Sequence, residues 1–483
     1  MRPWRIPDAV RELGRADPAA IAIIDAGREV PCSEFDQMAR RMAAWLERQG
    51  LRPGDRVGIT IRGNIDHLAT TLALMRLGCD QIGLASHDTP AMRADLAQRV
   101  GAVAVIGDQA EDAVGSLGLL IPDHAAIAAD PALDDSHIPT PGPDGTTVLI
   151  PSSGTTGRPK IIPMTERLLT LRGLARPQAT ARRCSAITAE FAQSRWSVLT
   201  AIAAGSCWAF HAPAKGPPLV DLVRRHGIEI VVLAPSRAEA LLQEVPRMGG
   251  WPAGVALNLT GTAVPGALRA RIQAELTRNL HVLYGATECG VVAIALPEDH
   301  ARHPDGVGRA WSASAIIVDE AGRRLPPGTP GVLRILSAGR ADGYLDDPAA
   351  TAAAFLPGGW YHTGDIATLT PDGHVLFGGR GDDMMILGTI NIFPTEIEGA
   401  ALGFPGLADC AAFALPSAAH GDLPVLAVVE AAPGRLDTAA LLAHCRARLG
   451  LRAPRKIVLV PAVPRNGVGK VLRHELAALA GRA

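Results

Sequence analysis

Short apolar runs alternate with amphipathic stretches through the first half of the chain. Residues 36–50 carry apolar side chains at helical spacing, which predicts a helix that ends at Gly50. Two further stretches predict helices, residues 68–77 and 197–204. Apolar runs predict short buried strands at residues 57–61, 103–106, 147–150, 228–233, 256–260 and 282–284. Strands that alternate with helices are typical of a layered α/β fold.

The pattern changes in three later regions. Residues 107–146 are polar, contain prolines and show little periodicity, so we expect a connecting region there. Between residues 316 and 377, short strands alternate with turns, which fits a β-rich subdomain. The final part of the chain, after residue 382, has its own apolar segments, at 411–415, 425–429 and 457–460. We therefore predict an α/β fold: a large N-terminal domain of layered α/β subdomains plus a β-rich subdomain, followed by a small α+β C-terminal domain.

Composition argues against several classes of function. The net charge is −1, so no overall field attracts nucleic acid or a membrane surface. Residues 1–20 are interrupted by prolines and charges, unlike a signal peptide, and no run of ~18 apolar residues could span a membrane. The seven cysteines are scattered with no Cys-x-x-Cys pair, which predicts neither a zinc site nor a disulfide framework. We therefore expect a cytoplasmic protein.

The residues best suited to phosphate chemistry are 151–160, Pro-Ser-Ser-Gly-Thr-Thr-Gly-Arg-Pro-Lys, directly after a predicted strand. Glycines let the backbone turn N–H groups toward an anion, and hydroxyls and an ammonium add donors. The segment is not a Walker A loop, because Arg158 and Pro159 separate Gly157 from Lys160. Taken alone, an ordinary Ser/Thr/Gly surface loop explains its composition at least as well.

Four more motifs accompany this loop, and together they resemble the AMP-forming adenylating enzymes. That superfamily contains the acyl-CoA synthetases, the luciferases and the peptide-synthetase adenylation domains. The five motifs are Ser153-Gly154-Thr155-Thr156-Gly157-Arg158-Pro159-Lys160, Tyr284-Gly285-Ala286-Thr287-Glu288, Gly359-Trp360-Tyr361-His362-Thr363-Gly364-Asp365, Gly379-Arg380-Gly381-Asp382-Asp383 and Pro464-Arg465-Asn466-Gly467-Val468-Gly469-Lys470. The likeness covers nearly the whole chain and is closest in kind to a stand-alone acyl- or aryl-CoA ligase.

The resemblance implies a domain plan and a reaction. Residues 1–379 would form the large AMP-binding domain, 380–383 a hinge that includes Asp382, and 384–483 a small mobile domain. A carboxylate would attack the α-phosphate of ATP, giving an acyl-AMP and pyrophosphate, and the acyl group would then pass to the thiol of CoA. Magnesium would assist, because it prefers carboxylate oxygen.

The resemblance also assigns roles to residues. Thr287, Glu288 and Lys470 would be catalytic, with Glu288 as the Mg²⁺ ligand. The residues that would bind ATP and AMP are Ser152, Ser153, Gly154, Thr155, Thr156, Gly157, Lys160, Gly261, Thr262, Ala263, Tyr284, Gly285, Asp365 and Arg380. Taken singly, Thr287-Glu288 also fits a helix N-terminus, Asp365 a turn and Lys470 a solvated loop.

The acyl pocket carries a departure from its relatives. Phe191-Ala192-Gln193-Ser194-Arg195-Trp196 resembles the Phe-Asp-x-Ser-x-Trp segment of amino-acid-activating domains, but Ala192 replaces the aspartate that holds the substrate's ammonium. We therefore expect an aryl or a short-to-medium organic acid without an amine. The residues expected to line the pocket are Ala192, Gln193, Trp196, Asn258, Thr260, Leu283, Val291 and Val292. Packing or capping is the alternative role for the polar ones.

Two other functions remain open. The chain could be a stand-alone adenylation enzyme that loads a separate carrier protein's phosphopantetheine arm, or an amine. It could also be a degenerate nucleotide-binding protein without catalysis. The intact motif residues argue against that alternative: Lys160, Glu288, Asp365, Arg380 and Lys470. The chain extends ~13 residues beyond Lys470, so we expect no fused carrier domain. The oligomeric state is open, with a homodimer as one option.

Overall fold

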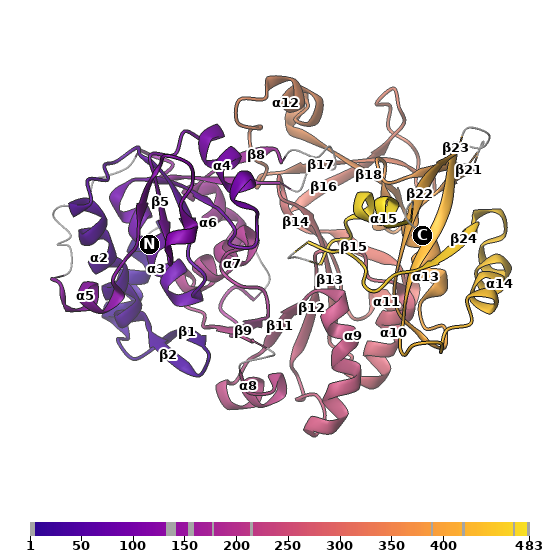
Figure 1. Cartoon of the computed structure of the whole chain (residues 1–483), viewed down its shortest axis with the longest axis horizontal. Coiled ribbons are helices and arrows are strands. Elements are labelled where there is room, and N and C mark those ends of the chain that lie inside the picture. Colours follow the sequence, from indigo (N-terminus) through magenta and orange to yellow (C-terminus); the bar gives the residue numbers. More distant parts are fainter. Residues whose placement is uncertain are drawn as a thin grey trace. The chain divides into compact units, whose positions relative to one another are not determined.

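The computed structural model describes residues 5–131, 142–152, 159–175, 178–212, 216–387, 390–417, 421–466 and 469–480. Figure 1 shows the helices and strands of the chain, coloured along the sequence. The chain divides into two compact units, each made of three segments. The first unit contains Met1–Val232, Ala286–Gly290 and Ala338–Gly359. The second contains Leu233–Gly285, Val291–Ser337 and Trp360–Ala483.

A six-stranded sheet in the first unit carries the predicted phosphate loop. Its order is β6-β5-β3-β4-β7-β8, and all neighbours run parallel except β7 and β8, which pair as an antiparallel hairpin. The strands are β3 (Arg56–Thr60), β4 (Asp80–Gly83), β5 (Ala104–Gly107), β6 (Gly118–Leu120), β7 (Thr147–Pro151) and β8 (Ile161–Thr165). The central residues of β3, β4, β5 and β7 are buried, as expected for strands inside a sheet that is covered on both faces.

A second group of strands in the first unit has the order β2-β1-β10-β9-β11. Only β1 and β2 are antiparallel to each other. These strands are β1 (Ile21–Asp25), β2 (Arg28–Pro31), β9 (Arg183–Ser185), β10 (Trp208–Phe210) and β11 (Ile230–Leu233).

Helices cover these strands and supply most of the apolar core. α3 is buried nearly all round, and it ends at Gly78, whose φ of 76° lets its N–H bond back to the last turn. Each fully buried aliphatic side chain of this kind contributes ~1.5–3 kcal/mol. The helices of the first unit are α1 (Ile6–Ala16), α2 (Cys32–Arg48), α3 (Asn64–Leu77), α4 (Pro90–Arg99), α5 (His124–Ala129), α6 (Glu166–Leu174), α7 (Ala192–Ala203), α8 (Leu219–His226) and α12 (Pro348–Ala354).

The second unit contains a long β region with strand order β16-β17-β18-β19-β15-β14-β13-β12. β12 and β13 run parallel, whereas the strands from β15 to β19 pair antiparallel. The strands are β12 (Ala256–Leu259), β13 (Leu280–Ala286), β14 (Gly290–Ala295), β15 (Gly306–Ala310), β16 (Ala313–Val318), β17 (Gly331–Ser337), β18 (Trp360–Leu369) and β19 (His374–Arg380). The accompanying helices are α9 (Pro235–Glu244), α10 (Gly266–Glu275) and α11 (Asp299–Arg302).

The C-terminal part of the second unit has its own sheet and core, drawn orange to yellow in Figure 1. The long hairpin of β22 and β23 is joined by β20 and β21 on one side, and β24 runs parallel to β23. The elements are β20 (Met385–Leu387), β21 (Ile390–Ile392), α13 (Pro394–Ala401), β22 (Leu407–Ser417), β23 (Gly421–Glu430), α14 (Thr438–Leu449), β24 (Lys456–Leu459) and α15 (Arg473–Ala480).

The predicted fold class is confirmed, but several boundaries differ. Residues 107–146, expected to be a connecting region, contain β6 and α5, and residues 132–141 lie outside the described part. α7 begins at Ala192 rather than at residue 197. α2 begins at Cys32 instead of Asp36, because Asp36 is buried and accepts a hydrogen bond from Arg76 instead of marking the helix start.

Two expectations from composition can be compared with the described residues. None of the helices described there is both long and apolar enough to cross a membrane. All seven cysteines are buried free thiols. Burial raises the pKa of each of them, for example to about 12 for Cys289. The cytoplasmic location stays a prediction.

Candidate active site

The predicted phosphate loop connects the two strands of the β7–β8 hairpin in the first unit. The N–H of Ser152 donates to the carbonyl of Lys160 over 2.7 Å, which closes the hairpin at the base of the loop. Ser153, Gly154, Thr155, Thr156 and Gly157 lie outside the described residues. The Lys160 ammonium lies 4.8 Å from the centre of the Tyr344 ring, at a distance where a cation is attracted to the ring face.

Glu288 belongs to the same unit and contacts the same tyrosine. Its side chain is 8% exposed, and its Oε1 accepts a hydrogen bond from the Tyr344 hydroxyl over 2.9 Å. Thr287 beside it is exposed. Tyr344 therefore contacts both the loop lysine and the predicted metal ligand. A buried carboxylate with one oxygen fixed in this way suits a hard cation such as Mg²⁺.

Arg172 on α6 holds the backbone that presents Thr287 and Glu288. It donates to the carbonyls of Thr287 at 2.9 Å, Glu288 at 2.6 Å and Gly339 at 2.7 Å. Burial lowers its pKa to about 10, against the opposing effect of Cys289 and Glu288, so the guanidinium stays charged at neutral pH. Three charge-assisted hydrogen bonds from one planar group fix the β13–β14 turn to α6 and to residue 339.

Asp365, Tyr284 and Arg380 form a compact cluster in the second unit. The Tyr284 hydroxyl donates to one Asp365 carboxylate oxygen, and Arg380 donates to the other over 3.2 Å. β18 and β19 pair Asp365 directly with Arg380. Burial raises the pKa of Asp365, and Arg380 partly opposes that shift. Burial and the facing Asp365 carboxylate raise the pKa of Tyr284 well above its usual value.

Arg380 also extends the cluster toward the predicted hinge. Its Nε lies 3.0 Å from one oxygen of Asp382, and its second terminal nitrogen lies 3.1 Å from the other. Gly364, between Thr363 and Asp365, has a φ of 72°, and a Cβ there would lie 3.3 Å from the guanidinium. A glycine is therefore needed at this position for both the backbone and the close approach.

The remaining residues that were predicted to bind the nucleotide lie at or just after strand ends in the second unit. Gly261, Thr262 and Ala263 come just after β12, and the φ of Gly261 is 101°. Gly285 is an exposed residue near the end of β13. All four are accessible at loop or strand-end positions, where backbone groups can meet a ligand.

The predicted pocket residues fall into two groups. In the first unit, Ala192 and Gln193 start α7, and Trp196 is 5% exposed within the apolar core. In the second unit, Asn258 on β12 and Thr260 just after that strand are half-buried. Asn258 Oδ1 lies 3.0 Å from Nδ1 of His281. The other members of this group are Leu283 and Val291, which are half-buried, and Val292, which is buried.

Lys470 follows a small turn in the C-terminal part of the second unit. The N–H of Lys470 donates to the Asn466 side chain, and the Asn466 N–H donates back to the Lys470 carbonyl, each over 2.9 Å. Arg465 donates to the Gly469 carbonyl over 3.0 Å and pairs with Asp409 at 2.8 Å. The backbone around Lys470 is therefore fixed by local bonds. Residues 467–468 are outside the described part.

Comparison with known proteins identifies the family. The profile of the AMP-binding enzyme family matches residues 10–345, and that of the AMP-binding enzyme C-terminal domain matches residues 396–470. The chain belongs to the AMP-binding enzyme family. The family predicted from the five motifs is thus confirmed, and the chain is an AMP-forming acid–thiol ligase.

The relatives are similar over most of their length. The chain is 28% identical over 485 residues to a feruloyl-CoA synthase of an Amycolatopsis species, covering 96% of each protein. It is 31% identical over 367 residues to a sulfoacetate–CoA ligase of Cupriavidus necator, covering 74% of this chain and 72% of that one. The solved structure of an o-succinylbenzoate CoA synthetase of Bacillus subtilis, with its acyl-adenylate intermediate, has the same fold, with a TM-score of 0.86, 21% identity and 97% coverage of both chains.

Arg172 and Tyr344 are the residues that the sequence did not reveal. Each lies outside the five motifs, and each contacts the Thr287-Glu288 motif from far along the chain. Only three tyrosines occur in the chain, and the other two lie within motifs. That scarcity is the one signal that could have directed attention to Tyr344; no local pattern singles out Arg172.

Proposed function

We propose that this enzyme activates an amine-free carboxylic acid with MgATP and transfers the acyl group to CoA. A carboxylate oxygen attacks the α-phosphate, the bond to pyrophosphate breaks, and an acyl-AMP forms. The CoA thiol then attacks the acyl carbon and releases AMP. The two sequence relatives described above are named as a feruloyl-CoA synthase and a sulfoacetate–CoA ligase, which supports CoA as the acceptor.

One observation carries the first half-reaction: Tyr344 contacts both Lys160 and Glu288. Two anions must meet in this step, so positive charge near the phosphates lowers the barrier. Lys160, together with Ser152 and the loop after it, would hold the β- and γ-phosphates, and Thr287 would donate to the α-phosphate. Magnesium supplies further charge neutralisation when it is bound, and Glu288 is the residue that would hold it.

The second-unit cluster would bind the nucleoside. Asp365 would accept from the ribose hydroxyls, with Arg380 beside it. Tyr284 would stack on the adenine, and Gly261, Thr262, Ala263 and Gly285 would line the base. The existing bond between Tyr284 and Asp365 supports this role, because it fixes the ring and the carboxylate relative to each other before the ligand arrives.

The class of carboxylic acid is inferred from the residues at the start of α7. Ala192 offers no carboxylate for an ammonium group, and an unpaired buried charge is costly. The expected substrates are therefore aryl or aliphatic acids, with Gln193, Trp196, Asn258, Thr260, Leu283, Val291 and Val292 as further lining residues. Amino acids should be poor substrates.

The test is ATP–pyrophosphate exchange across a panel of aryl, aliphatic and amino acids, followed by mass spectrometry of products formed with CoA. We expect exchange with at least one amine-free acid, and an acyl-CoA from that acid. Faster exchange with an amino acid than with every amine-free acid would refute the proposed substrate class. Exchange without any acyl-CoA would refute CoA as the acceptor and direct the search to a carrier protein or an amine.

A further inference from the structure

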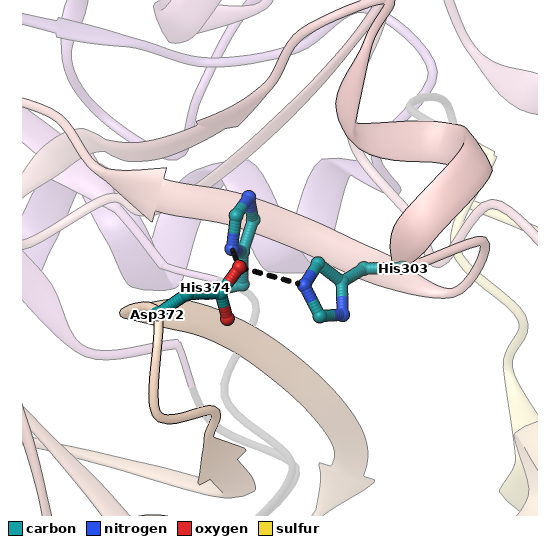
Figure 2. A group of neighbouring side chains, drawn as sticks. All are labelled: His303, Asp372 and His374. Atoms are coloured by element: carbon teal, nitrogen blue, oxygen red, sulfur yellow. Dashed lines mark hydrogen bonds and ion pairs between the residues drawn. The ribbon is translucent and has the colours of Figure 1, made fainter.

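Two histidines and an aspartate lie together in the second unit, away from the five motifs. We name His303, Asp372 and His374 the histidine–aspartate cluster (Figure 2). His303 follows α11, Asp372 lies in the turn between β18 and β19, and His374 begins β19. Figure 2 shows the Asp372 carboxylate next to both imidazole rings. One ligand atom from each residue lies within 4.8 Å of the other two.

The distances between the ligand atoms are close to those around a metal ion. Asp372 Oδ2 lies 3.1 Å from Nε2 of His303 and 3.0 Å from Nδ1 of His374. Metal bonds of about 2.0–2.2 Å in a tetrahedral site place neighbouring ligand atoms roughly 3.3–3.6 Å apart. A small rearrangement of the rings is therefore enough to admit an ion. The rings already lie close, with centres 4.2 Å apart.

The contacts of His374 provide a second observation. Its Nε2 lies 2.8 Å from Asp299 Oδ1, and a carboxylate only accepts, so Nε2 carries the proton. His374 is 1% exposed, and its Nδ1 makes no hydrogen bond although Asp372 lies 3.0 Å away. A metal ion bound between Nδ1 and this carboxylate oxygen would give both atoms a partner.

Asp299 is placed like the carboxylates that, at many metal centres, accept a hydrogen bond from a histidine ligand without binding the metal themselves. A histidine ligand typically donates its other N–H to a carboxylate, which fixes the ring and makes the free nitrogen a better ligand. Asp299 does this for His374, and its second oxygen accepts from the backbone of Leu296 over 2.8 Å. Asp372 is positioned similarly, since Thr370 donates to its Oδ1 over 2.5 Å and leaves Oδ2 toward the rings.

Charge and access also suit a cation. Asp299 and Asp372 contribute two negative charges, and the nearby cation is the half-exposed Arg309, whose guanidinium lies 3.9 Å from Asp372 Oδ2. The side chains of Asp372 and His303 are 39% and 18% exposed, so an ion can enter from solvent. Two imidazoles and one carboxylate favour Zn²⁺ and its first-row neighbours over Mg²⁺ or Ca²⁺.

We propose that His303, Asp372 and His374 bind one divalent transition-metal ion, with Asp299 orienting His374. The ion replaces the proton between His303 and Asp372 and leaves at least one position for water. Such an ion would tie the segment after α11 to the β18–β19 turn. This site is separate from the residues proposed to bind MgATP.

The test uses the untagged, full-length protein without nucleotide, titrated with Co²⁺ while visible absorption is recorded, and with Zn²⁺ in a calorimeter. We expect one ion per chain and a d–d spectrum without a thiolate band. Asp372→Asn and His303→Gln should each weaken binding at least tenfold, and Asp299→Asn by about 10–100-fold. The control is His124→Gln, because His124 faces a single carboxylate, Asp66, at 3.5 Å and has no third ligand among the described residues.

Circular dichroism without metal would show that each variant is folded. Both Asp372 and His303 are partly exposed, so at least one of these variants should retain the fold. A wild-type protein that binds no Co²⁺ or Zn²⁺ would overturn the proposal. Binding by folded Asp372→Asn as tight as wild type would overturn it as well.

Discussion

At the scale of single residues, Glu288 is the most informative carboxylate in the proposed site. Glu288→Gln keeps the shape and the bond from Tyr344 but removes the charge that would hold Mg²⁺. We expect adenylation to fall by ~10²–10³-fold, the size found for one electrostatic group, with the fold unchanged. The measurement is ATP–pyrophosphate exchange against magnesium concentration. The control is Glu12→Gln, an exposed acid on α1; an unchanged magnesium dependence in Glu288→Gln would show that another residue holds the metal.

His67 predicts a pH dependence of stability. Its Nδ1 lies 2.7 Å from the Ile61 carbonyl and its Nε2 2.5 Å from a buried Arg195 nitrogen, so the ring is neutral and donates through Nδ1. Burial, together with the adjacent Arg195 guanidinium, lowers its pKa to about 3. As the pH falls, the His67 imidazole therefore takes up a proton in the unfolded chain before it does so in the folded protein. The stability that His67 contributes above pH 6.5 is lost as the pH falls toward 3.

The variant His67→Gln isolates that effect. Over the interval from pH 6.5 to 4, wild type should lose ~1.4 kcal/mol per pH unit through this residue, and His67→Gln should lose correspondingly less. The measurement is urea unfolding at several pH values. His87→Gln, at a half-exposed histidine, serves as control. Parallel stability curves for wild type and His67→Gln would contradict a neutral buried imidazole.

The residue scale also shows what sequence can and cannot reveal. Lys160, Glu288 and Asp365 were predicted because each sits in a short motif whose neighbours share its chemistry. Arg172 and Tyr344 were missed because their importance arises from contacts 115 and 56 residues away along the chain. Such contacts depend on how helices and strands pack, which no local pattern encodes.

At the scale of elements, α6 supports the turn between β13 and β14 through Arg172. Arg172→Lys keeps the charge but cannot reproduce three hydrogen bonds in one plane. We expect kcat/KM for adenylation to fall by roughly 10–100-fold, since hydrogen bonds to charged groups contribute ~1.5–3 kcal/mol each. The matched control is Arg167→Lys, an exposed arginine of the same helix. Equal activity in both variants would mean that the turn is fixed without Arg172.

Elements with a clear pattern of apolar residues were predicted, and elements with a weak pattern were not. The strands at β3, β7 and β12 stand out as short apolar runs between turn residues. β6 and α5 did not, because β6 is only three residues long and α5 buries only Ile127. α7 was predicted too short because its first turn, Ala192 and Gln193, is not yet part of the buried face. In these segments, packing against neighbouring elements determines the secondary structure more than the local pattern of apolar residues does.

At the scale of the whole molecule, the proposed mechanism needs a C-terminal domain that moves at the hinge, residues 380–383. Arg380 and Asp382 bond through both oxygens of the carboxylate, so the hinge begins with a paired segment. Closure of one domain on another is a common way to assemble a site for one step only. Asp382→Pro would restrict the backbone there, and we expect it to slow thioester formation more than adenylation.

We propose that Lys470 serves adenylation, in which its positive charge would stabilise the meeting of two anions, and not the transfer to CoA. The measurement is the rate of each half-reaction, acyl-AMP formation from acid and ATP, and thioester formation from pre-made acyl-AMP and CoA, in Lys470→Ala. The matched control is Lys456→Ala, an exposed lysine of the same C-terminal part. We predict that Lys470→Ala lowers the first rate by ~10²–10³-fold and leaves the second within about twofold. An equal loss in both half-reactions would contradict this account.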